Sequence, residues 1–247
     1  MSEPGARLVK VAELDLAYEP APWAFAQSRA EEIAAHWATR KAALPQLFDG
    51  RVLLLGRHEF ARREDGATIL RGAYFATDYK AFLAWRDFGY PDHDVCNCFS
   101  MAALVSSDGA FLLGEMAAHT ANAGSIYFPA GTPDPSDIVG GRVDLAASAR
   151  RELQEETGIS ADEVVTSPDW TIVHAPPRIA CMKIMRMSEN AESIKARVDA
   201  FLAQDPDAEL RRLHIVRRTH DLAALSSPRF VADFIRRRLE GGQSAVG

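Results

Sequence analysis

One short stretch of the chain gathers three carboxylates: Arg151-Glu152-Leu153-Gln154-Glu155-Glu156-Thr157-Gly158-Ile159. Glu152, Glu155 and Glu156 stand at i, i+3 and i+4, the spacings that place side chains over one another on a helix. They would repel one another unless a cation lay among them. Arg151 lies four residues before Glu155 and can neutralise one carboxylate, which leaves the others free for a hard divalent metal that prefers oxygen ligands. The stretch therefore predicts an acidic helix with a metal site.

Residues on either side mark the ends of this helix, which we expect from about 145 to 157. Asp144 suits the N-cap, where its side-chain oxygen can accept a bond from a free N–H of the first turn. Gly158 suits the left-handed position that follows a helix. Apolar residues recur every four positions and would bury one side on a sheet: Leu145, Ala149 and Leu153. The alternative is a solvated acidic helix face with no bound metal.

The stretch resembles the core of the Nudix box, REUxEExGU (U aliphatic), of Mg²⁺-dependent hydrolases that act on nucleoside diphosphates linked to another group. The resemblance implies an α/β fold, specifically a Nudix-type α/β/α sandwich with a mixed sheet. It implies that Glu152, Glu155 and Glu156 are catalytic residues that hold Mg²⁺ or Mn²⁺. It also implies that the carbonyl of Ala130 completes the coordination, and that Arg151 orients the site by pairing with Glu155.

The upstream half of the box departs from the family pattern. Counting back from Arg151 places Val143 where the family has a glutamate, and Asp137 where it has a glycine. Phe128-Pro129-Ala130-Gly131 resembles the family's entrance to the box, so residues 132–141 are interpreted as an insertion that lengthens the loop. Asp134 and Asp137 could bind metal there, but their Pro-rich setting favours simple turn formation.

The order of elements around the box is the Nudix order, and we assign residues 96–247 to a Nudix hydrolase domain. A hairpin around Ser107-Asp108-Gly109 precedes a short strand, the glycine loop and the acidic helix. Further elements are expected after the box: strands at 171–173 and 179–187 joined through Pro176-Pro177, a helix at 191–202, a strand at 210–216, and a last helix from the Ser227-Pro228 cap to 239.

Residues 1–95 are expected to form a smaller α+β region. It would hold a helix over 24–44, a hairpin of 51–60 with 68–75, and a helix capped by Thr77. The block from Trp37 to Gly50 resembles an N-terminal element of longer Nudix proteins, including a eukaryotic hydrolase of UDP-sugars. The competing and favoured interpretation is a helix-to-strand turn that places Leu47 and Phe48 in the core.

Composition limits the function classes. The chain has 247 residues, a formal charge of −6 and a pI near 5.7, which gives no electrostatic footprint for nucleic acid. No apolar stretch reaches the roughly 18 residues of a membrane span, so we expect no membrane partner and a cytoplasmic location. The three cysteines, Cys96, Cys98 and Cys181, are interpreted as buried thiols rather than a zinc site.

Together these features predict a metal-dependent diphosphohydrolase with a small-molecule nucleotide substrate, of the ADP-ribose or nucleotide-sugar type. The general base is not assigned: Glu152 matches the glutamate that some family members use, and others use a glutamate from a distal loop. The distal candidates are Glu189, Glu192 and Glu209, and histidines that could also belong to the site are His119 and His174. Whether the chain forms a homodimer is left open.

Two alternatives remain at this stage. Val143 in place of the box glutamate would suit a regulatory or nucleotide-binding module that kept the fold and lost turnover. Retention of all three later carboxylates argues against it, because an inactive site has no need of such repulsion. An isomerase or DNA-repair glycosylase on the same fold is the second alternative, and the chain lacks the Cys₄ spacing of an iron–sulfur cluster that would favour the glycosylase.

Overall fold

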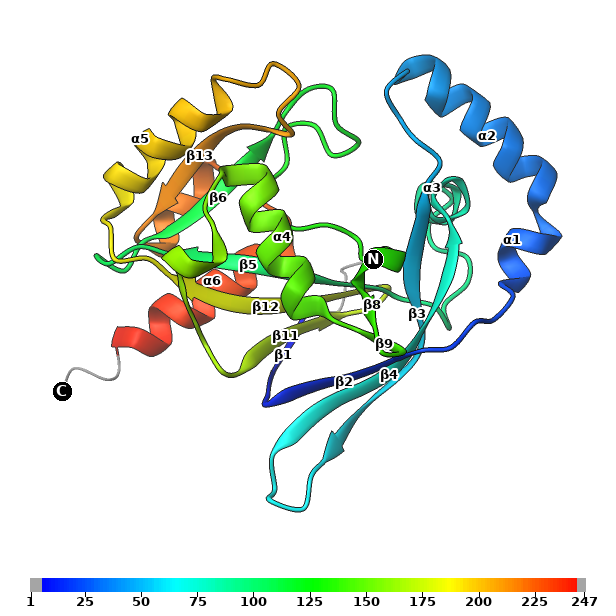
Figure 1. Cartoon of the computed structure of the whole chain (residues 1–247), viewed down its shortest axis with the longest axis horizontal. Helices are drawn as coiled ribbons and strands as arrows, with labels where there is room; N and C mark the ends of the chain where they lie inside the picture. The colour runs from blue at the N-terminus through cyan, green and yellow to red at the C-terminus, as the bar shows by residue number, and fades with distance from the viewer. Residues whose placement is uncertain (1–5, 244–247) are drawn as a thin grey trace.

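The computed structural model describes residues 6–243 and contains two mixed sheets with helices packed around them (Figure 1). Sheet A has eight strands, six of them in the order β1-β11-β12-β5-β6-β13, with β7 paired to β6 and β10 to β12. Its strands are β1 (Arg7–Val11), β5 (Asn97–Val105), β6 (Phe111–Met116), β7 (Ile126–Tyr127), β10 (Val165–Thr166), β11 (Trp170–Ala175), β12 (Arg178–Arg186) and β13 (Leu210–Val216).

Sheet B has five strands in the order β3-β4-β2-β9-β8. They are β2 (Glu13–Tyr18), β3 (Arg51–Arg62), β4 (Thr68–Asp78), β8 (Ile138–Val139) and β9 (Arg142–Val143). The helices are α1 (Ala24–Ser28), α2 (Ala30–Ala43), α3 (Tyr79–Asp87), α4 (Leu145–Thr157), α5 (Ala191–Leu202) and α6 (Arg229–Gln243), with short 3₁₀ turns η1 (Pro135–Asp137), η2 (Ala161–Glu163) and η3 (Thr219–Ala224). The α/β/α arrangement with a mixed sheet confirms the predicted fold class.

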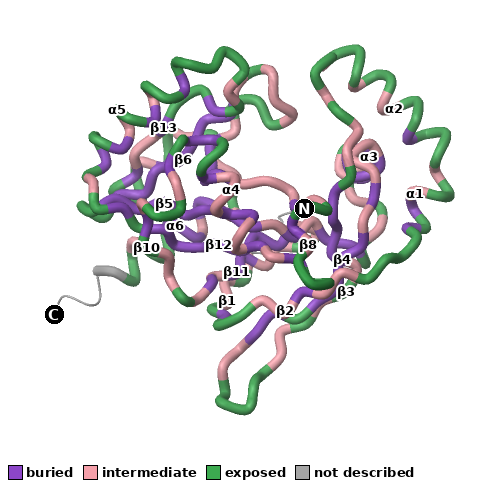
Figure 2. The backbone as a smooth tube through the Cα atoms, viewed as in Figure 1, coloured by how far each residue is buried: buried purple, intermediate pink, exposed green. Residues whose placement is uncertain are grey.

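Sheet A is covered on both faces. Helix α4 crosses one face and α6 lies behind the sheet, while α5 lies beside β13 (Figure 1). The central strands are buried along their length, whereas the outer sides of α2 and α5 are exposed (Figure 2). Phe234 of α6 packs against Phe111 and Phe128, with ring centroids 6.0 and 5.9 Å apart. This core fixes the Phe128 end of the glycine loop.

Helix α4 spans the residues that its capping and apolar residues predict. The Asp144 side chain accepts hydrogen bonds from the backbone N–H groups of Ala146 and Ala147 at 3.0 and 2.9 Å, as an N-cap should. Gly158 ends the helix at φ 71°, in the left-handed region. Leu145, Ala149 and Leu153 are buried, as expected for the face toward the sheet.

The N-terminal region differs from expectation in several elements. The expected helix over 24–44 is interrupted at Arg29, which separates α1 from α2. Strand β4 continues to Asp78 because Asp78 pairs with Arg51 of β3, so Thr77 lies in the strand and does not cap α3. The amide of Lys80, in the first turn of α3, donates instead to the Asp49 side chain at 2.9 Å.

Five strands were not anticipated: β10, which pairs with β12 within sheet A, and β1, β2, β8 and β9. β1 pairs with β11 of sheet A although it lies in the N-terminal region. β8 lies within residues 132–141, interpreted as an insertion, and β9 follows them directly and joins sheet B through the pair Ala17–Arg142. β2 completes sheet B beside β4. Sheet A therefore contains a strand from residues 1–95, and sheet B contains two strands from residues 96–247. The division of the chain between residues 95 and 96 stays a prediction.

The apolar layer between the sheets holds all three cysteines. Cys96, Cys98 and Cys181 are free thiols, and all three are buried, as expected. The Tyr74 hydroxyl donates to the Cys98 carbonyl at 3.0 Å in the same layer. No helix within residues 6–243 is both long and apolar enough to cross a membrane.

Candidate active site

The glycine loop and the acidic helix approach each other closely. The Pro129 carbonyl accepts a hydrogen bond from the Ala102 amide of β5 at 3.0 Å, which ties the loop to the middle of sheet A. A β-carbon at Gly131 would collide with the carboxyl group of Glu152. A side chain at residue 131 would therefore require the Glu152 carboxyl group to move.

Glu156 is the most deeply placed of the three box carboxylates, at 5% exposure. Its Oε1 accepts a hydrogen bond from the Ala130 amide at 3.3 Å, and its Oε2 is buried without a partner in the described part of the chain. Burial raises the pKa of Glu156 well above its ordinary value, and the nearby charge of Glu152 adds to the effect. A buried oxygen without a partner is a position that a ligand can fill.

Glu152 and Glu155 differ in their surroundings. Burial raises the pKa of Glu152 to about 7, although the Arg151 charge and its hydrogen bond act in the opposite direction. The Glu155 side chain is 63% exposed and faces solvent at the end of the cluster. The predicted three-carboxylate face therefore has two shielded members and one open to water.

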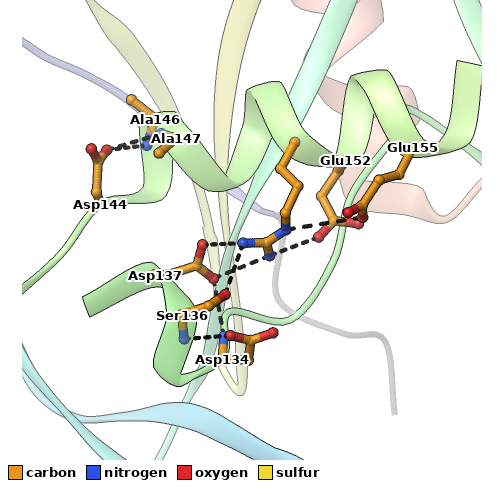
Figure 3. Close-up of polar contacts among 9 residues, drawn as sticks. Asp134, Ser136, Asp137, Asp144, Ala146, Ala147, Glu152 and Glu155 are labelled. Carbon is orange, nitrogen blue, oxygen red and sulfur yellow. Dashed lines mark hydrogen bonds and ion pairs between the residues drawn. The ribbon is translucent and has the colours of Figure 1, made fainter. Parts of the chain in front are cut away.

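Arg151 has a different principal partner from the one expected. Its Nη1 lies 2.5 Å from Asp137 Oδ1 and its Nη2 3.3 Å from Asp137 Oδ2, whereas its Nε lies 3.9 Å from Glu155 Oε2. Nη2 also donates to Glu152 Oε1 at 3.1 Å, so one guanidinium joins Asp137 to Glu152 (Figure 3). The expected pairing with Glu155 is the weakest of the three contacts.

Asp137 is placed for this contact by the inserted loop. Its side chain is 1% exposed, and its Oδ2 also accepts the Asp134 amide at 3.0 Å within the turn η1. The Asp134 side chain accepts the Ser136 amide at 2.6 Å, so both aspartates form the turn that the sequence favoured (Figure 3). The hydrogen bond from Arg151 to Asp137 is the largest cause that raises the pKa of Arg151.

Val143 lies away from the carboxylates. It is 5% exposed in β9 and belongs to the apolar cluster between the two sheets. The loop before it is anchored to sheet B, because the Leu53 amide donates to the Pro133 carbonyl at 2.7 Å. The insertion therefore changes which residue reaches Arg151, and Asp137 supplies the carboxylate there.

The site suits a hard divalent cation. Within residues 6–243 no three carboxylate, imidazole or thiol side chains converge on one point. Mg²⁺ is commonly bound by one or two carboxylates, with waters and substrate phosphates as the other ligands. Glu152 and Glu156 are two shielded carboxylates with raised pKa values, and one of their oxygens lacks a partner. A cation would lower those pKa values and supply that partner.

A cavity of about 1490 Å³ extends from the glycine loop to the N-terminal region. Ala130 and Gly131 line it at the carboxylate end, and Gln46, Leu47 and Phe48 line it from the loop before β3. Phe48 is 81% exposed, so the expectation that it lies in the core is wrong. The Gln46 side chain donates to the His119 carbonyl, which links this loop to residues 117–125 across the cavity.

The three distal glutamates proposed as general bases differ in whether they line the cavity. Glu209 lines the cavity, and its charge contributes to the raised pKa values of Glu152 and Glu156. Glu189 lies 3.1 Å from Arg197 and Glu192 lies 2.8 Å from Arg217, and neither lines the cavity. Of the three distal glutamates, only Glu209 is near the box.

Both candidate histidines line the cavity. His174 Nε2 lies 2.9 Å from Nε2 of His58, so this pair joins β11 of sheet A to β3 of sheet B. Burial lowers the pKa of the His58 and His174 imidazoles.

Asn97 and Arg178 are among the cavity residues that sequence reasoning missed. They are Cα partners in the parallel pairing of β5 with β12. Asn97 lies between Cys96 and Cys98. Its pairing with Arg178, which is distant in sequence, depends on the register of the two strands. No local sequence signal carries that information.

Comparisons with known proteins agree with the box. The family model described as the NUDIX domain matches residues 98–192. Similar solved structures are a Nudix hydrolase, RenU, from M. smegmatis, a MutT protein from Methanosarcina mazei Go1 and an Ap4A hydrolase from C. elegans. Their identities are 18%, 19% and 13%, and their TM-scores are 0.39, 0.40 and 0.36. The alignments cover 61%, 59% and 60% of this chain, and 86%, 94% and 96% of theirs.

No curated protein matches the sequence. The family match contains the glycine loop, the inserted turn and the whole of α4 with its three carboxylates. Residues 98–192 of the chain therefore match the NUDIX domain.

Proposed function

We propose that this protein is a Mg²⁺- or Mn²⁺-dependent diphosphohydrolase that cleaves the diphosphate bridge of a nucleoside diphosphate linked to another moiety. ADP-ribose and nucleotide sugars are the favoured substrates. The observation that carries the proposal is the buried Glu156 on α4, with the half-buried Glu152 near it and one unpartnered Glu156 oxygen, beside a glycine loop that lines a large cavity. A cytoplasmic location and a homodimer stay predictions.

Glu152, Glu156 and the Ala130 carbonyl would hold the cation, with Glu155 as an outer carboxylate. A bound divalent cation would neutralise phosphoryl charge and favour hydroxide formation from water. Arg151 is a positioning residue that holds Glu152, and Asp137 holds Arg151 in turn. Glu152 and Glu209 are the carboxylates that we propose as proton acceptors from water, and Glu209 lines the cavity.

A product assay tests this function. Purified protein is incubated with ADP-ribose, UDP-glucose, NADH, dinucleoside polyphosphates, CoA and 8-oxo-dGTP, each with Mg²⁺, Mn²⁺ or a chelator. The expected result is release of a nucleoside monophosphate from at least one diphosphate-linked substrate with metal only. Binding without release from any substrate would contradict the proposal and favour the nucleotide-binding module.

A matched control separates site chemistry from general charge effects. Glu189→Gln removes a carboxylate that pairs with Arg197 outside the cavity, and turnover should stay within about twofold of wild type. Equal loss in Glu189→Gln and Glu156→Gln would show that the assay reports stability rather than the site.

A further inference from the structure

The start of β5 and the start of β12 form a polar pair in the wall of the cavity. Asn97 and Arg178 are Cα partners in the parallel ladder, and both side chains line the cavity. Phe99 and Met101 also line it, which places the odd-numbered side chains of β5 on the cavity face. The pair is therefore held by two central strands of sheet A rather than by a loop.

Asn97 has an unmet hydrogen-bonding requirement. Its Oδ1 is shielded from solvent and has no hydrogen-bond partner within the described residues. A buried acceptor left unpaired destabilises a protein, so such groups are uncommon without a reason. The position fits an acceptor kept for a donor that arrives with a ligand.

Arg178 offers the complementary group beside it. The side chain is half-buried, and no carboxylate between residues 6 and 243 forms an ion pair with it. Its Nη2 donates to the Tyr90 hydroxyl at 3.0 Å, and its guanidinium lies 5.3 Å from the centroid of that ring. The guanidinium is thus held in place with other N–H groups left to donate.

The pair lies well away from the carboxylates. Ala102 contacts the glycine loop and stands five residues after Asn97, which corresponds to about 16 Å along the strand. Aromatic side chains line the space beside the pair: Phe99 and Phe230 meet edge to face with centroids 6.1 Å apart. A flat group that extends from the reacting diphosphate would reach this wall.

We propose that Asn97 and Arg178 bind the hydrogen-bonding edge of the substrate's nucleobase, with Phe99 and Phe230 as the apolar wall for the ring. A nucleobase edge presents a donor beside an acceptor, which matches the Asn97 acceptor and the Arg178 donors. A free phosphate offers acceptors only and would leave Asn97 Oδ1 unpaired. This inference rests on the proposed function because it assigns the base subsite of the same cavity.

The first test is Asn97→Leu, a change of similar volume that removes the unpaired oxygen. The melting temperature should equal or exceed that of wild type, because an unsatisfied buried polar atom is lost. On the best nucleoside diphosphate substrate, kcat/KM should fall about tenfold or more, mainly through KM. On a base-free analogue of that substrate, kcat/KM should stay within about twofold of wild type.

The second test is Arg178→Met, with Arg186→Met as its control on the exposed far end of β12. Arg178→Met should weaken nucleoside monophosphate binding about tenfold in calorimetry without metal, and Arg186→Met should leave it unchanged. Wild-type affinity in both Asn97→Leu and Arg178→Met would overturn the base subsite, as would equal losses on base-bearing and base-free substrates.

The two proposals can fail separately. If wild type hydrolyses a diphosphate and Asn97→Leu does so with unchanged KM, the base subsite is wrong and the hydrolase stands. If wild type hydrolyses nothing, but nucleoside monophosphates bind and Asn97→Leu weakens that binding, the subsite stands and the hydrolase is wrong.

Discussion

The two segments of the box region, residues 132–144 and 145–158, contribute to one site but differ in how far local sequence determines their structure. From residue 145 to 158, the cap, the apolar spacing and the terminal glycine are local features, and α4 begins and ends where they indicate. From residue 132 to 144, an insertion replaces the family spacing, and Asp137 contacts Arg151 from a position where the pattern has a glycine. The comparison shows that a turn fourteen residues before Arg151 supplies the carboxylate beside it, whereas Val143, at the position of the family glutamate, is buried between the sheets.

The largest effect is expected in the downstream half. Glu156→Gln removes a buried ligand charge, so kcat should fall by about 10² or more while the fold is kept. Steady-state kinetics at saturating Mg²⁺, with circular dichroism for the fold, measure it. Near-wild-type turnover would exclude Glu156 from the metal site.

Val143→Glu tests whether the upstream half lacks a functional glutamate. Because Val143 is buried between the sheets, the new charge should lower the free energy of unfolding by about 2 kcal/mol or more. Activity should not rise. A tenfold gain in kcat/KM, equivalent to about 1.4 kcal/mol, would show that residue 143 belongs to the site and that the insertion is misplaced.

Asp137→Asn tests the carboxylate that we place beside Arg151. Loss of its charge weakens the hold on the guanidinium that contacts Glu152, so kcat should fall about tenfold with little change in KM. Asp134→Asn is the control in the same turn and should change kcat by less than about twofold. Equal effects of the two substitutions would indicate that only the turn matters.

The smallest effect concerns the junction of the two sheets. His58 and His174 have pKa values lowered by burial, so the native state binds fewer protons than the unfolded chain. Stability should therefore fall as the pH drops below the ordinary histidine value of about 6.5. Urea unfolding between pH 5 and pH 8 should show that the free energy of unfolding depends less steeply on pH in His58→Asn than in wild type. The same pH dependence in both proteins would show that the histidine pair does not contribute.

The sequence allowed prediction where structure depends on neighbouring residues. Asp144 and Gly158 marked a helix because caps act within one turn. The prediction that Phe48 lies in the core was wrong because its exposure depends on a cavity formed by distant segments. Strand β1 was not predicted because its partner β11 is far along the chain. Asn97 and Arg178 became visible only through the β5–β12 register. The acidic half of the site was therefore predictable, and the opposite wall was not.

The most direct test of the central claim measures nucleoside monophosphate release against Mg²⁺ concentration in wild type and Glu156→Gln. We expect no release with chelator, saturable activation by Mg²⁺ in wild type, and a residual rate of about 1% or less in the variant. Release that is independent of added metal, or equal in the two proteins, would contradict the claim that the α4 carboxylates carry a metal-dependent diphosphate cleavage.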